Sequence, residues 1–98
     1  MPKFPTEEER DGPDAVRYHF DLHDGVEIFL DTEGHELADH AAAYKHATIF
    51  LLEAAAELLP RTVGDRRIEV SARGESGTAI LKMSILFEPR FLAKDQLN

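Results

Sequence analysis

The spacing of hydrophobic residues changes twice along the chain, and this pattern limits the possible folds more than any other feature. Apolar and polar residues alternate in 17–30, recur with helical spacing in 40–59, and alternate again in 68–87. Alternation predicts strands with one buried face, whereas helical spacing predicts an amphipathic helix. The sequence therefore predicts two hairpins that flank a single long helix.

The first predicted hairpin joins two alternating segments through Asp24-Gly25. A two-residue loop would put their apolar sets on opposite faces of the sheet, whereas a three-residue loop, 23–25, puts them on one face. Burial therefore favours the longer loop, with Gly25 in the left-handed conformation after a type I turn. This register pairs Leu22 with Val26, Phe20 with Ile28 and Tyr18 with Leu30.

The helix and the second hairpin follow from similar signals. Residues 40–59 are rich in Ala, Leu and Glu, with Asp39 as the predicted N-cap and Pro60 as the residue that stops the helix. Leu37 is expected to pack beneath the sheet. A four-residue loop, 74–77, pairs Ala72 with Ala79, Val70 with Leu81, Ile68 with Met83 and Glu69 with Lys82.

Each predicted element has one apolar face, and burying these faces together gives an α+β domain. We expect a ββαββ order, with a four-stranded antiparallel sheet and one long helix packed on one face. The domain covers residues 17–90, with a flexible acidic extension at 1–16 and a tail at 91–98. At 98 residues the chain is too short for a second domain.

Charge is distributed unevenly along the chain, whose net charge is −8. Residues 1–40 hold 12 acidic and three basic residues, a net charge of −9, whereas residues 41–98 hold seven acidic and eight basic ones, a net charge of +1. Such an acidic chain repels phosphate backbones, so nucleic-acid binding is not expected. The sequence has no cysteine, no apolar run of membrane-spanning length and no apolar N-terminal leader, which predicts a cytoplasmic protein that does not bind membranes.

Two motifs carry a resemblance to a known family. The first, an aromatic-rich strand with an Asp-Gly turn, is Arg17-Tyr18-His19-Phe20-Asp21-Leu22-His23-Asp24-Gly25. The second, which precedes the Ala-rich helix, is Asp31-Thr32-Glu33-Gly34-His35-Glu36-Leu37-Ala38-Asp39. Over residues 17–88 the chain resembles a small bacterial family of domains of unknown function, family 6894. The resemblance implies no activity, and residues 1–15 depart from the family pattern, whose members usually begin at the first strand.

His19, Asp21 and His23 recur at every second position, so an extended strand would place three metal-ligating side chains on one face. The predicted loop removes His23 from the strand, and histidines on a solvated face are ordinary surface residues. We therefore predict no metal site and no cofactor, and we expect a chelator to leave the melting temperature unchanged.

Candidate catalytic groups are equally weak. Asp21 and Glu27 are predicted to face each other, but acid–base catalysis would require that they be buried together. The acidic segment 31–39 lacks the spacing of a twelve-residue calcium loop. The Gly74–Gly77 turn lacks the Gly-x-Ser-x-Gly pattern of a nucleophile elbow. We predict no catalytic residue, and the chain is not expected to be an enzyme.

The basic cluster consists of Arg61, Arg66, Arg67 and Arg73. It could bind a phosphate group or an acidic partner, or it could simply offset the acidic first hairpin. We expect a non-catalytic domain that acts through protein–protein contacts or self-association. The alternative is a nucleic-acid-associated or antitoxin-like regulatory module.

The predicted interaction surface consists of apolar residues that one sheet does not cover. Helical geometry directs Ala43, Ala47, Phe50, Leu51, Ala54 and Leu58 toward the sheet and places Ile49, Leu52 and Ala56 on the far side of the helix. Phe29, Ile80 and Leu86 are expected on the outer face of the sheet. Contiguous exposed apolar residues usually mark contacts, so the sequence predicts a homodimer, with an unidentified protein partner as a further expectation.

Overall fold

The computed structural model describes residues 15–93. Most of the predicted acidic extension and residues 94–98 of the predicted tail lie outside this range. The elements are β1 (Val16–His23), β2 (Ile28–Phe29), β3 (His35–Leu37), α1 (His40–Leu58), the 3-10 helix η2 (Leu59–Arg61), β4 (Arg66–Arg73) and β5 (Ala79–Phe87).

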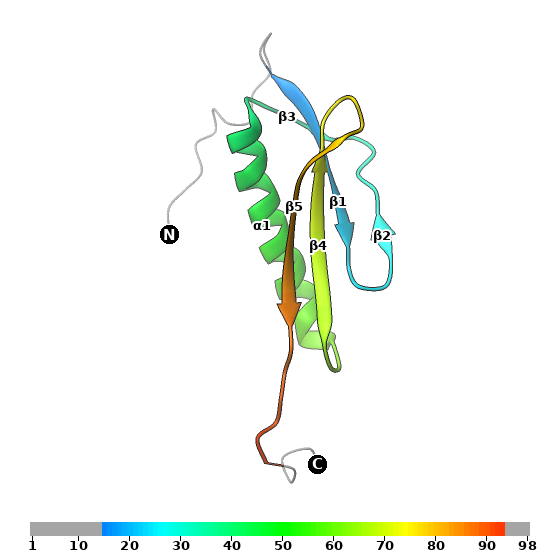
Figure 1. Cartoon of the computed structure of the whole chain (residues 1–98), viewed down its shortest axis with the longest axis vertical. Helices are drawn as coiled ribbons and strands as arrows, with labels where there is room; N and C mark the ends of the chain where they lie inside the picture. Colours follow the sequence, from blue (N-terminus) through cyan, green and yellow to red (C-terminus); the bar gives the residue numbers. More distant parts are fainter. Residues whose placement is uncertain (1–14, 94–98) are drawn as a thin grey trace.

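The strands form one antiparallel sheet in the order β2-β1-β4-β5, and β3 pairs with the beginning of β1. Helix α1 packs mainly on β4 and β5, while β1 and β2 lie farther from it (Figure 1). The predicted α+β class, the ββαββ order and the single covering helix are confirmed. The short strand β3 was not predicted.

The predicted register of the first hairpin is wrong. Leu22 pairs with Phe29, and His23 pairs with Ile28, so the loop has four residues. Asp24 Oδ1 closes this loop by accepting hydrogen bonds from the N–H groups of Val26 (2.8 Å) and Glu27 (2.7 Å). Gly25 is left-handed as predicted, with φ +98°. The longer loop reverses the faces of the second strand, which leaves Val26, Ile28 and Leu30 exposed.

A second aspartate determines where the pairing of β1 with β2 ends. Asp31 Oδ2 accepts a hydrogen bond from the N–H of Phe20 at 3.0 Å. In the predicted register, this N–H group belonged to a longer pairing of the first two strands. Asp31 Oδ1 also accepts the N–H of Gly34 at 2.9 Å and turns the chain back. Tyr18 consequently pairs with His35 of β3, because the preceding segment has already left the sheet.

The second hairpin has the predicted faces but a register shifted by two residues. Val70 pairs with Met83, and Glu69 lies opposite Ser84, so the predicted pair of Glu69 with Lys82 is wrong. The connection is longer than predicted because Gly74 N–H donates to the Thr78 carbonyl at 3.1 Å. A two-residue shift preserves the alternation of side chains, so the buried face is unaffected.

Helix α1 begins as predicted, since Asp39 accepts the N–H of Ala42 at 2.9 Å, and η2, which contains Pro60, follows its last residue, Leu58. Four of the five buried residues of α1 are alanines, whose side chains are small: Ala42, Ala43, Ala47 and Ala55. Leu37 packs in the core as expected. The core residues are Tyr18, Phe20, Leu37, Ala42, Ala43, Ala47, Leu51, Ala55, Ile68, Val70 and Ala72.

Candidate functional site

Strand β5 forms one edge of the sheet and pairs only with β4 within residues 15–93. Leu81, Met83 and Ile85 pack against the core, whereas Ile80, Lys82, Ser84 and Leu86 are exposed on the open face. An edge strand presents unpaired N–H and C=O groups that can pair with another chain. We refer to this strand and its exposed side chains as the β5 edge.

Helix α1 adds apolar surface beside the β5 edge. Thr48 Oγ1 lies 3.7 Å from Met83 Sδ, so the row of residues spaced by four along the helix, Tyr44, Thr48 and Leu52, runs beside β5. Leu52 is 56% exposed and Tyr44 is also exposed. Of the other residues predicted on the far side of the helix, Ala56 is exposed and Ile49 is half-buried.

A groove lies at the opposite side of the helix, over β1 and β2. Two adjoining hollows of about 400 and 300 Å³ share Leu22, Phe29 and Phe50 in their walls. Phe29 therefore belongs to the helix-covered face of the sheet, and its predicted position on the outer face is wrong. We call these two hollows the β1–β2 groove. Its other lining residues are Phe20, Asp24, Leu30, Asp31, His35, His46, Glu53, Ala54, Glu57 and Leu58.

The three residues considered as metal ligands are each engaged in hydrogen bonds within the protein. Asp21 accepts hydrogen bonds from Arg73 Nε (2.7 Å) and Nη2 (3.2 Å), His19 Nδ1 lies 2.8 Å from the Asp31 carbonyl, and His23 Nδ1 accepts the N–H of Gly25. Across residues 15–93 no three His, Asp or Glu side chains are grouped so that they could hold a metal ion.

The carboxylates of the first hairpin are held as anions by structural contacts. Burial alone would raise the pKa of Asp21, but the hydrogen bonds from Arg73 and from the N–H of Asp31 outweigh it and lower the pKa. Burial likewise opposes ionisation of Asp31, yet three backbone N–H donors lower its pKa. Because Leu22 pairs with Phe29 and His23 with Ile28, Glu27 lies in the loop and not opposite Asp21, so the carboxylate pair considered from the sequence does not form.

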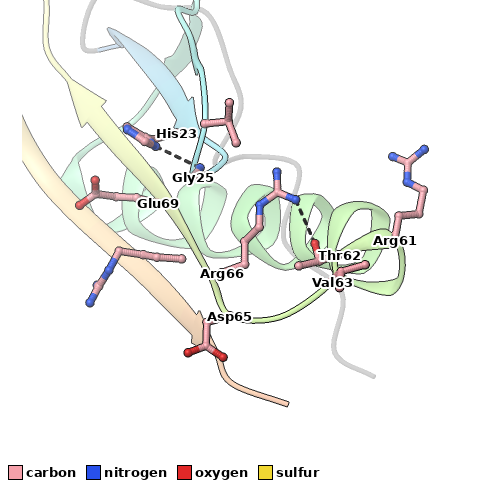
Figure 2. Close-up of a pocket in the computed structure, with 10 residues that line it drawn as sticks. His23, Gly25, Arg61, Thr62, Val63, Asp65, Arg66 and Glu69 are labelled. Carbon is pink, nitrogen blue, oxygen red and sulfur yellow. Dashed lines mark hydrogen bonds between the residues drawn. The ribbon is translucent and has the colours of Figure 1, made fainter. Parts of the chain in front are cut away.

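The predicted arginine cluster is divided between two places. Arg61, Arg66 and Arg67 line a cleft of about 560 Å³ together with Asp65 and Glu69, whereas Arg73 binds Asp21. Figure 2 shows the labelled side chains spread around this cleft rather than converging on one point.

Each arginine in the cleft already has an internal partner. Arg66 Nε donates to the Asp24 carbonyl at 2.6 Å, and its Nη1 donates to Thr62 (Figure 2). Arg61 pairs with Glu57, and Arg67 donates to Ser84. The geometry therefore gives little support to an anion-binding site here.

Comparison with known proteins follows the same boundaries as the fold. The sequence model of the domain of unknown function DUF6894 matches residues 17–86, from the second residue of β1 to the penultimate residue of β5. The chain belongs to the DUF6894 family. No curated protein and no solved structure matches this DUF6894 chain. No helix within residues 15–93 is long and apolar enough to cross a membrane.

Two features of the DUF6894 domain are not predicted by the sequence. The β1–β2 groove depends on the register of the first hairpin, which the turn around Asp24 determines. The ion pair of Asp21 and Arg73 joins residues 52 apart in the sequence and depends on the pairing of β1 with β4. One signal for the groove was available, because a single helix is too narrow to cover four strands.

Proposed function

We propose that this DUF6894 domain is a non-catalytic cytoplasmic protein that acts through protein contacts and forms a homodimer through the β5 edge. The observation that carries the proposal is a nine-residue strand at the end of the sheet, paired on one side only within residues 15–93. Adding a strand to such an edge forms main-chain hydrogen bonds without requiring a specific sequence. A chain without cysteine suits a reducing compartment.

The sequence of β5 suits antiparallel pairing with a second copy of itself. A two-fold axis at Met83 would place Ile80 opposite Leu86 of the second copy and Lys82 opposite Ser84. Apolar side chains would then face apolar side chains, and the two lysines would not oppose each other. Side chains directly opposite each other on neighbouring strands are close enough to interact, and such cross-strand pairs stabilise a sheet.

The distribution of charge also favours contact at this edge. The strand order places the acidic first hairpin on the half of the sheet away from β5. Lys82 is the only charged residue among positions 79–87. Two copies that meet at β5 would therefore keep their acidic halves apart and avoid much of the repulsion that a net charge of −8 would otherwise cause.

The helix supports the same contact. Because Tyr44 and Leu52 lie beside β5, pairing of two β5 strands would bring these exposed residues of both copies toward the same seam. Burying a leucine side chain fully contributes about 1.5–3 kcal/mol before the costs of association. Main-chain hydrogen bonds between the two β5 strands and burial of apolar side chains of the two α1 helices would both stabilise the dimer.

The other functions considered have less support. The ionisable side chains Asp21, Asp31 and Arg73 are engaged in contacts that hold the strands together, which suits a structural role better than catalysis. Nucleic-acid binding would require an open sheet face that is basic. Asp21 and Glu69 lie on that face and offset its basic residues.

Light scattering on the full chain at tens of micromolar tests the proposal. We expect the wild-type protein to have a mass twice that of one chain. We expect Leu86→Glu to have the mass of one chain, because its carboxylate would be placed in the apolar dimer interface. Val63→Glu is the matched control, since Val63 is 98% exposed in the loop before β4 and should leave the dimer intact.

Circular dichroism of Leu86→Glu should show an unchanged fold, because Leu86 is exposed on one face of β5. A monomeric wild-type chain at these concentrations would contradict self-association. A dimer that persists in Leu86→Glu and in Leu52→Glu would contradict its assignment to the β5 edge.

A further inference from the structure

The β1–β2 groove is the part of the sheet that α1 leaves uncovered. Packed helices lie about 8–10 Å apart and neighbouring strands about 4.8 Å apart, so one helix covers roughly two strands. Helix α1 covers β4 and β5, and the apolar face of β1 and β2 continues beyond it. Leu22 and Phe29, which are paired neighbours on these strands, form the floor of the groove.

The walls of the groove are apolar and its rim is acidic. Phe50, Ala54 and Leu58 form the side that belongs to α1, while Glu53 and Glu57 stand along the exposed margin of the same helix. Glu57 pairs with Arg61, whereas Glu53 has no ion-pair partner within residues 15–93. An occupant would therefore meet an apolar surface bordered by carboxylates.

We propose that the β1–β2 groove binds a basic amphipathic helix from a partner protein. An amphipathic helix places apolar residues along one stripe, which matches a groove of this kind, and lysine or arginine beside that stripe would face Glu53 and Glu57. A helix in this position would complete the second layer of the domain over β1 and β2.

Charge complementarity selects this occupant over two others. A second copy would bring another acidic first hairpin against the acidic rim. Residues 1–14 of the same chain contain Glu7, Glu8, Glu9, Asp11 and Asp14 against Lys3 and Arg10, so they carry the wrong charge as well. A basic segment gains attraction at the rim and is steered by the net charge of −8.

This inference rests on the proposed function in one respect, that the domain acts through protein contacts. It does not depend on the dimer, because the groove and the β5 edge lie at opposite sides of the sheet. The Leu86→Glu variant separates the two, since it should abolish the dimer and leave binding at the groove unchanged. Loss of the dimer with retained peptide binding in this variant agrees with both proposals. A wild-type chain that is monomeric but binds the peptide contradicts only the dimer, and a wild-type dimer that does not bind the peptide contradicts only the groove.

Titration of the full-length isotope-labelled protein with a synthetic Leu/Lys peptide tests the groove. The peptide has about five helical turns, with Leu at i, i+3, i+4 and i+7 and Lys elsewhere. We expect chemical-shift changes at Phe29, Phe50 and Leu58. A scrambled peptide of the same composition and a peptide with Glu in place of Lys should bind at least about tenfold more weakly.

Variants locate the contact. Phe29→Asp should weaken binding by at least about tenfold, because it puts a charge on the apolar floor. Glu53→Lys, an exposed change that keeps the fold, should weaken it about two- to fivefold. Val63→Asp and Glu75→Lys, both exposed and away from the groove, are the matched controls and should leave the affinity unchanged.

Four results would overturn the proposal. The acidic peptide could bind as tightly as the basic one, or the shift changes could map outside the groove. Groove resonances of the free protein could change with its own concentration, which would make a second copy the occupant. Nuclear Overhauser contacts between Phe29 and residues 1–14 in the free protein would make the N-terminal segment the occupant.

Discussion

At the scale of single residues, Asp21, Asp24 and Asp31 organise the first hairpin through hydrogen bonds. Asp24 closes the turn after β1, and Asp31 accepts the N–H of Phe20 in β1. Arg73 of β4 then joins the network by donating to Asp21 and to the Asp31 carbonyl. These carboxylates resemble catalytic groups in the sequence, but their role here is structural. They accept hydrogen bonds from main-chain N–H groups for which the short strand β2 supplies no carbonyl.

The ion pair of Asp21 with Arg73 should stabilise the fold in a pH-dependent way. Asp21→Asn should lower the free energy of unfolding by about 1.5–3 kcal/mol at pH 7, the usual range for a hydrogen bond to a charged group. Because folding lowers the pKa of Asp21, this stability is fully present above the unfolded pKa, about 3.9, and is lost as the pH falls through the folded value.

Urea unfolding from pH 7 to pH 2 measures this effect, and the gap between Asp21→Asn and the wild type should narrow below about pH 4. Asp65→Asn is the control, because Asp65 pairs with Arg90 at an exposed site and should matter much less. A gap that is constant across this range would show that the charge of Asp21 contributes nothing to stability.

At the scale of elements, the sequence predicted the type of each long element but not the details of strand pairing. Helix α1 and its cap at Asp39 follow from local signals, and so do β4 and β5. Burial alone predicts the wrong register for the first hairpin, because hydrogen bonds to the side chain of Asp24 select the turn. The second was shifted by two residues, a change that burial does not detect.

The connection from β2 to β3 depends on Gly34, whose φ is +76°. A Cβ at Gly34 would lie 2.8 Å from the Tyr18 carbonyl oxygen, so an alanine would meet backbone that cannot move easily. Gly64 has a similar φ of +87° but open space around it. Gly64→Ala should therefore cost about 1 kcal/mol for its backbone conformation, and Gly34→Ala at least about twice as much.

Thermal or urea unfolding of the two glycine variants gives the comparison directly. Equal losses of stability in Gly34→Ala and Gly64→Ala would contradict the close approach of this turn to β1. A larger loss in Gly64→Ala would also contradict it, since a Cβ added at Gly64 would meet no atom of another segment within 4 Å.

At the scale of the whole molecule, the strand order turns the uneven charge of the sequence into an acidic side and a nearly neutral side of the sheet. The acidic first half of the chain supplies β1 and β2, and the nearly neutral second half supplies β4 and β5. The sequence indicated exposed apolar residues but could not assign them to edges, because strand order depends on contacts between distant segments. The structure places Leu52, Ile80 and Leu86 at the β5 edge and Phe29 in the groove.

Amide hydrogen exchange of β5 at several protein concentrations tests the central proposal most directly. If β5 pairs with a second copy, those amides of residues 79–87 that point away from β4 should exchange quickly in dilute solution and become protected as the concentration rises. Amides of β1 should show no such dependence and serve as the internal reference. Exchange of the outward β5 amides that stays fast and independent of concentration would contradict the proposal.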